Sequence, residues 1–184
     1  MKKGFTMIEL IFVIVILGIL ASVAIPRLAA TREDAEISAG VANIRTLLSD
    51  ANAYYVAKGD FNGAKWKDFT NAPLKDSNGN AIDAKVGAVG SITSSGGTKT
   101  FLAVGEKNCL QVGIRDSAES TYIAFAPVAE NKNAGACATF LASDLVKQLL
   151  DGTKPAGDDP ELNFCQGIKN GGMSCMVISP SRIY

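Results

Sequence analysis

Histidine is absent from the 184-residue sequence, and several kinds of catalytic site are absent with it. Without an imidazole the chain cannot form a Ser-His or Cys-His nucleophile pair. Histidine is also the most frequent general base and the commonest metal ligand in proteins, so these roles would fall to other residues. The sequence also lacks a GxxxxGK[ST] loop, and the Gly-rich stretch 87–97 is predicted to be a surface loop rather than a phosphate cradle. Asp and Glu pairs could hydrolyse glycosides, but no pair is marked by its context. We therefore expect a protein that is not an enzyme.

An excess of charge of either sign is also missing, because 18 basic residues balance 18 acidic ones. A nucleic-acid-binding domain usually carries a clustered basic surface. We therefore expect no strong binding of nucleic acid. The length leaves room for one modest globular head after a long first helix, and for no second full domain.

The longest apolar run extends from Phe5 to Ile25 and contains one ionisable side chain, that of Glu9. As a helix it would be about 32 Å long, enough to cross a hydrocarbon core of about 30 Å. Lys2 and Lys3 precede it, and the positive-inside tendency places them in the cytoplasm. The run therefore predicts a single membrane span, with the rest of the chain outside the cytoplasm.

Glu9 is the most informative residue of this run. A carboxylate near the centre of a bilayer costs about 2.5 to 3.5 kcal/mol on insertion scales, so it indicates a function and a partner. No basic residue lies between Lys3 and Arg27. We therefore expect the partner outside the segment: cleavage after Gly4 would create a cationic amine on Phe5 that could meet Glu9 of a second copy.

The stretch GFTMIELIFVIVILGILASVAIP resembles the amino terminus of type IV prepilins and type II secretion pseudopilins. The resemblance rests on a Lys-rich leader, Gly4, Phe5, Glu9 and the closing Pro26. It implies that a prepilin peptidase cleaves between Gly4 and Phe5 and methylates the new amine, and that Glu9 guides subunit addition. It implies as partners the same chain, other pilins or pseudopilins, and an inner-membrane assembly platform.

Within that resemblance two functions compete. One is a pseudopilin whose short periplasmic filament pushes secreted proteins outward, which we favour. The other is a pilin of a surface filament serving adhesion, twitching motility or DNA uptake. Major pseudopilins usually show a Tyr-Pro-Thr segment after the long helix, where this chain has the sequence of residues 59–63, Gly-Asp-Phe-Asn-Gly. Cysteines near the carboxyl end are also common in surface pilins.

Two other interpretations of the apolar run remain. Ser22-Val23-Ala24 offers the small-x-small pattern of an ordinary signal peptide, and cleavage there would yield a soluble secreted binding protein starting at Ile25. Against it, Glu9 interrupts the apolar region and Pro26 follows the cleavage point. A plain membrane anchor explains neither the Gly-Phe junction nor the acid.

After Pro26 the pattern becomes amphipathic and predicts a helix over residues 26–58. Lys58 and Gly59 give a last-turn cation followed by a C′ glycine, so the helix should end there. Pro26 should bend the helix, or else separate two helices. The resemblance implies that residues 18–26, from Gly18 to Pro26, unwind when subunits pack. Apolar residues recur at helical spacing: Ile37, Val41, Ile44, Leu48, Ala51 and Tyr55, widened by Leu47 and Tyr54.

The remaining residues predict an α+β fold of pilin-like type, in which the long helix packs on a small antiparallel sheet. The domains are a leader at 1–4, a transmembrane and assembly helix at 5–25, an amphipathic helix at 26–58 and a β-rich head at 59–184. Ser143 is a candidate N-cap for a short helix, Asp144–Leu150. The predicted strands are Phe101–Val104, Cys109–Ile114, Tyr122–Ala126, Asn163–Gln166 and Ser174–Ile178.

The four cysteines are Cys109, Cys137, Cys165 and Cys175. An even number in an oxidising compartment predicts two disulfides with three possible connectivities. We favour Cys165 with Cys175, because a Gly-rich turn lies between them, which leaves Cys109 with Cys137. A zinc site of four thiolates is the metal alternative, although no CxxC pair exists, and free buried thiols are a third.

Acidic residues also gather in a loop near the carboxyl end, where oxygen ligands could bind calcium. The resemblance adds weight, because major pseudopilins carry a calcium-binding loop in this part of the chain. A solvated acidic loop is the favoured interpretation, and no other cofactor is expected. The candidate ligands are Asp151, Asp158, Asp159 and Glu161.

Overall fold

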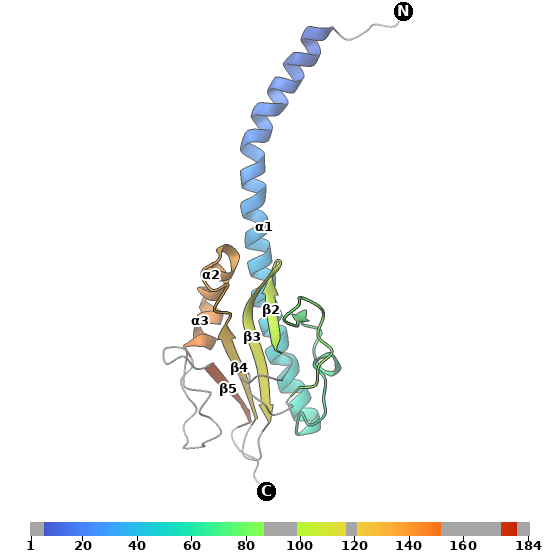
Figure 1. Ribbon diagram of the computed structural model, residues 1–184, viewed down its shortest axis with the longest axis vertical. Coiled ribbons are helices and arrows are strands. Elements are labelled where there is room, and N and C mark those ends of the chain that lie inside the picture. The colour runs from blue at the N-terminus through green and yellow to red at the C-terminus, as the bar shows by residue number, and fades with distance from the viewer. Residues whose placement is uncertain (1–5, 87–98, 117–120, 152–173, 180–184) are drawn as a thin grey trace, which may run out of the picture. The chain divides into compact units, whose positions relative to one another are not determined.

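The computed structural model describes residues 6–86, 99–116, 121–151 and 174–179. These residues form two compact units, 1–35 and 36–184. The first helix, α1 (Met7–Lys58), contributes to both (Figure 1). The other elements are a 3-10 helix η1 (Trp66–Asp68), strands β1 (Leu74–Lys75), β2 (Thr100–Val104), β3 (Lys107–Asp116), β4 (Thr121–Pro127) and β5 (Ser174–Ser179), and helices α2 (Gly135–Leu141) and α3 (Asp144–Leu150).

Helix α1 continues through Pro26. Pro26 therefore does not separate two helices, which was the alternative to a bend within one helix. It ends at Lys58, as predicted. Gly59 has φ 85°, and its N–H donates to the Tyr55 carbonyl at 2.7 Å. A left-handed residue at this position satisfies an end carbonyl and stops the helix, which is why glycine is favoured there.

The sheet has the order β1-β2-β3-β4-β5, and every neighbouring pair is antiparallel. The architecture is therefore the predicted α+β, pilin-like one: a long helix followed by a small antiparallel sheet. Three of the predicted strands match β2, β3 and β4, and a fourth matches β5, with end differences of one or two residues. The candidate strand Asn163–Gln166 lies outside the described residues.

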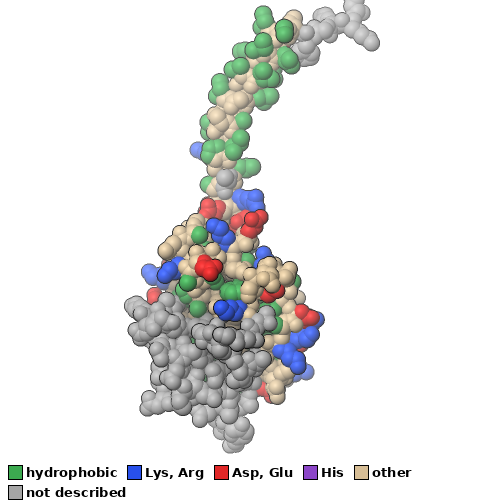
Figure 2. Space-filling model, in the orientation of Figure 1, with side chains coloured by type: hydrophobic (Ala, Val, Ile, Leu, Met, Phe, Trp, Pro, Cys, Tyr) green, Lys and Arg blue, Asp and Glu red, His purple; other side chains and the backbone are tan. Residues whose placement is uncertain are grey.

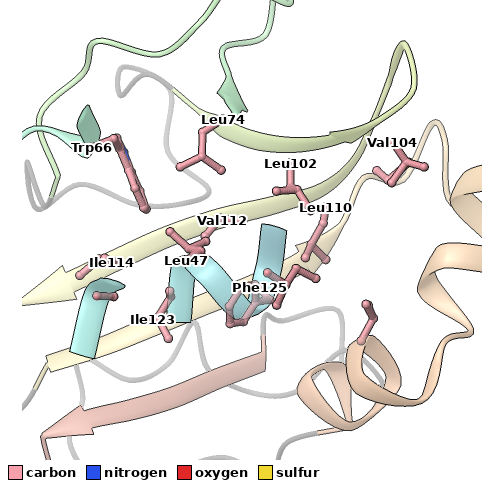
Figure 3. Close-up of a cluster of buried hydrophobic side chains, with 14 of the residues drawn as sticks. Leu47, Trp66, Leu74, Leu102, Val104, Leu110, Val112, Ile114, Ile123 and Phe125 are labelled. Atoms are coloured by element: carbon pink, nitrogen blue, oxygen red, sulfur yellow. The ribbon is translucent and has the colours of Figure 1, made fainter. Parts of the chain in front are cut away.

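The core of the head lies between α1 and the sheet (Figure 3). From α1, the side chains of Ile44, Leu47 and Ala51 are fully buried. Leu47, expected at the flank of the apolar stripe, lies at its centre. From the sheet, the core takes a set of aliphatic and aromatic side chains: Leu102, Val104, Leu110, Val112, Ile114, Ile123 and Phe125.

Gly40 lies on the same buried face of α1, although the apolar stripe did not include it. A Cβ at this position would lie 2.9 Å from Val104 Cγ2 and 3.0 Å from Phe140 Cε2. Both neighbours are buried, so neither has free space to move into. The glycine therefore allows the helix backbone to approach β2 and α2 closely.

The segment that follows α1, residues 59–70, packs against the last turns of the helix. Phe61 is buried, and its ring lies 5.3 Å from the rings of both Tyr54 and Phe69. The Thr70 hydroxyl donates to Asp50 Oδ2 at 2.8 Å. Aromatic contacts and one charge-assisted hydrogen bond thus order a segment that has few strand or helix residues of its own.

Helix α3 has the predicted bounds, and Ser143 occupies its N-cap position. The Ser143 hydroxyl, however, makes no cap hydrogen bond. It donates instead to the Phe140 carbonyl at 2.6 Å, at the end of α2. The expected capping role of this side chain is therefore wrong: the nearby end of α2 offers an acceptor that competes with the α3 amides.

Candidate functional site

The start of α1 holds the acid that the sequence singled out. Glu9 Oε2 accepts hydrogen bonds from the Thr6 backbone N–H at 2.8 Å and from the Thr6 hydroxyl at 2.6 Å. In return, Thr6 Oγ1 accepts the Glu9 N–H at 3.4 Å. Thr6 is thus the N-cap of α1 and Glu9 its third residue, the two partners of a capping box.

This geometry corrects the expectation that Glu9 has no partner within its own segment. The partner, Thr6, is neutral, so a search for basic residues missed it. The pattern Thr6-Met7-Ile8-Glu9 could have revealed it, because it is the sequence signature of a capping box. The hydrogen bonds compensate part of the cost of placing the carboxylate in an apolar environment. They supply no positive charge, so the carboxylate remains available to a cation.

The remainder of the apolar part of α1 is exposed in the isolated chain. Its large side chains, from Met7 to Leu28, are 40% to 81% exposed (Figure 2). The polar groups within it bond to their own helix: the Ser22 hydroxyl donates to the Ile19 carbonyl at 2.7 Å. By length and composition the helix is able to cross a membrane. An exposed apolar surface of this size is typical of a helix that is covered by lipid or by another protein.

Two other residues of α1 were predicted to matter in assembly. Nothing in the described structure lies within 4 Å of a Cβ placed on Gly18, so no contact within the chain requires a glycine there. Pro26 lies inside the helix and cannot donate to the Ser22 carbonyl. Unwinding between these residues stays a prediction. Gly4 and Phe5, the predicted cleavage and methylation residues, lie outside the described residues.

The disulfide predicted between Cys109 and Cys137 is present and joins β3 to α2. The two Cα atoms are 5.2 Å apart, and both side chains are fully buried. Cys175 is disulfide-bonded as well, whereas Cys165 lies outside the described residues, so the predicted pairing of these two is untested. The oxidised pair contradicts a zinc site of four thiolates, and it contradicts free thiols at Cys109 and Cys137.

Replacing Cys109 and Cys137 together by alanine is expected to lower the free energy of unfolding of the head by about 3 kcal/mol, because the bridge closes a loop with a sequence separation of 28. Trp66 is the sole tryptophan and is 3% exposed, so its fluorescence reports denaturant unfolding of the head. Reduced and alkylated wild-type protein is the control and should lose at least as much. A loss below about 1 kcal/mol in the double variant would contradict a stabilising role.

Of the four candidate calcium ligands, only Asp151 is described. Its N–H donates to the Lys147 carbonyl at 2.7 Å, which ends α3. Asp158, Asp159 and Glu161 lie outside the described residues. Among the residues that the structure does describe, no group of three acidic, cysteine or histidine side chains could hold a metal ion.

Comparison with known proteins gives matches to the amino-terminal motif and to two relatives. Residues 1–25 match the family model of the prokaryotic N-terminal methylation motif. Type II secretion system core protein G of Dickeya chrysanthemi is 42% identical over 53 residues, 29% of this chain and 35% of the relative. The same protein of Pectobacterium carotovorum subsp. carotovorum is also 42% identical over 53 residues, which is 34% of its length.

The match thus spans about a third of the length of these curated relatives. No solved structure matches the chain. The motif match covers the Lys-rich leader, Gly4, Phe5 and Glu9, on which the resemblance rests, and it ends one residue before Pro26. The chain therefore carries a prokaryotic N-terminal methylation motif at the start of a pilin-like α+β fold, and it is homologous over part of its length to the pseudopilin known as type II secretion system core protein G.

Proposed function

We propose that this chain is a non-enzymatic structural subunit of a type II secretion pseudopilus, a short periplasmic filament that serves protein secretion. The observation that carries the proposal is the hydrogen-bonded Glu9, which lies within the methylation motif and in the otherwise apolar first part of α1. The capping box with Thr6 would serve any helix, but a plain anchor has no use for the charge of that acid. A filament subunit uses it to bind the amine of a neighbouring copy, because each charge is costly in a helix bundle unless paired.

The proposed location follows from the same segment. Before assembly, the chain spans the bacterial inner membrane once, with Lys2 and Lys3 in the cytoplasm and the head outside. The disulfide between Cys109 and Cys137 supports an oxidising compartment for the head. The proposed partners are further copies, other pseudopilins, the prepilin peptidase and the inner-membrane assembly platform. Assembly needs no cofactor in this proposal, and no strong binding of nucleic acid.

A surface pilin is the second candidate function. It is favoured by the segment after α1, where residues 59–63 replace the Tyr-Pro-Thr that the resemblance implies for a major pseudopilin. The disulfide at Cys175, near the carboxyl end, is a further feature common in surface pilins. Both candidates share the processing and assembly of the amino terminus. The first experiment therefore distinguishes a filament subunit of either kind from a secreted soluble protein.

That experiment determines the first residue of the mature protein. We expect it to be an N-methylated Phe5, found by mass spectrometry in the membrane fraction of cells that express the filament machinery. A matched control is Ala24→Leu, which removes the small-x-small pattern of Ser22-Val23-Ala24 and should leave the Phe5 start unchanged. A mature chain starting at Ile25 and found in soluble form would overturn the proposal.

A further inference from the structure

Two Asn-Gly pairs in the described part of the head differ in how the glycine nitrogen is held. They are Asn62-Gly63 and Asn78-Gly79, both exposed, with glycine φ values of 74° and 83°. In an Asn-Gly pair, the glycine nitrogen is unhindered by a side chain and lies within reach of the asparagine amide carbon. A hydrogen bond donated by this nitrogen slows the attack, because the N–H must lose its proton before the nitrogen can act as a nucleophile.

The nitrogen of Gly79 is engaged. Its N–H donates to the Asp76 carbonyl at 3.1 Å. The N–H groups of Asn78 and Asn80 donate to Asp76 Oδ1 at 2.8 Å and 2.9 Å. The backbone N–H of Asn80, with these other donors, lowers the pKa of the Asp76 carboxyl, so the carboxylate that organises this turn stays ionised near neutral pH.

The nitrogen of Gly63 differs from that of Gly79 in its hydrogen bonding. On either side of it, the Asn62 N–H donates to Asp60 Oδ1 at 2.9 Å and the Ala64 N–H donates to the Phe61 carbonyl at 3.1 Å. For the N–H of Gly63 itself, the described residues provide no acceptor. Nothing lies within 4 Å of a Cβ placed on Gly63 or on Gly79, so the two turns are equally open and differ in the hydrogen bond of the glycine nitrogen.

We propose that Asn62 is a site of spontaneous deamidation in the folded protein. The Gly63 nitrogen forms a bond to Asn62 Cγ, loses its proton to water and expels the side-chain nitrogen as ammonia, which leaves a cyclic imide. Water then opens the imide at one of its two carbonyls. The products are aspartate and isoaspartate, and the net reaction consumes one water and releases one ammonia.

The isoaspartate product affects the adjacent aromatic cluster, because its main chain is longer by one methylene. Phe61 precedes the site, is 1% exposed and packs on Tyr54 and Phe69. An added backbone atom at residue 62 therefore displaces Phe61 or strains the turn. The aspartate product adds only a charge at the exposed position. The inference does not rest on the proposed filament function.

The test compares the two pairs within one molecule. Full-length protein in detergent is incubated at mildly alkaline pH, digested with trypsin and analysed by mass spectrometry. Trypsin places the two pairs in separate peptides, 59–65 and 76–85. We expect peptide 59–65 to gain the mass of deamidation about fivefold faster than peptide 76–85, roughly the factor that one net hydrogen bond supplies. Equal rates, or a faster reaction at Asn78, would overturn the proposal.

Two controls connect the rates to the structure. In denaturant, both turns are lost and the two rates should become equal. Asp76→Ala removes the carboxylate acceptor from the second turn and should raise the rate at Asn78 towards that at Asn62. If the fivefold ratio survives unfolding, the local sequence sets it and the assignment to the folded turn is wrong.

Discussion

A Gly4→Asp precursor is expected to remain uncleaved. The residue before the proposed scissile bond has no side chain, and a peptidase pocket that fits glycine should not accept a bulky acid. Mass spectrometry of the membrane fraction should then find the chain with its leader, residues 1–4, and no methylated Phe5. The effect should be complete rather than partial, because the substitution acts on the bond that is broken.

The unprocessed chain is also expected to form no filament. Without cleavage, Phe5 keeps its peptide bond to Gly4 and offers no cationic amine to a neighbour's Glu9. Gly4→Ala is the matched control, since it adds a single methyl group and should be processed slowly and still assemble. A normal Phe5 start in the Gly4→Asp protein would contradict the proposed cleavage site, and filaments built from uncleaved chains would contradict the role of the amine.

Elements set by local chemistry were predictable from the sequence. Lys58 and Gly59 gave the end of α1, and the helix Asp144–Leu150 has its predicted bounds. Helix α2 was missed because its N-cap is Ala134 and its first residue is Gly135, so no capping signal marks it. It lies against the sheet through Cys137 and Phe140, whose burial depends on residues far away in the chain.

In the candidate site and the helix that carries it, features set by neighbouring residues were also predictable, and a feature set by distant residues was not. Glu9 was identifiable from its cost in an apolar run, and its capping partner Thr6 was readable three residues before it. The requirement for glycine at position 40 was not readable, because it arises from Val104 and Phe140, which meet the helix only in the folded head. Spacing along the chain predicts a helix face, but close approach between elements depends on tertiary packing.

Glu9→Val is expected to leave membrane insertion intact or improved, because it removes the only charge from the apolar span. Filament assembly should nevertheless fail. In the assembled bundle, the amine of Phe5 in one copy and Glu9 in another would neutralise each other. Removing one member of such a buried pair typically costs about 3 to 5 kcal/mol, since the other charge is left unpaired.

Glu9→Gln separates this pairing from the capping box. A glutamine at this position keeps the acceptor for the Thr6 N–H, so α1 should still begin at Met7. It carries no charge, so it should assemble as poorly as Glu9→Val. Glu9→Asp keeps the charge with a shorter reach and should be intermediate.

The measurement compares sheared or cross-linked filaments with membrane-bound monomer for each variant, expressed with the filament machinery. Loss of filaments in both Glu9→Val and Glu9→Gln attributes the requirement to charge. Filaments from Glu9→Gln alone would attribute it to the hydrogen bonds with Thr6. A wild-type yield from Glu9→Val would show that the acid does not register subunits, and other contacts of the apolar helices would then have to account for assembly.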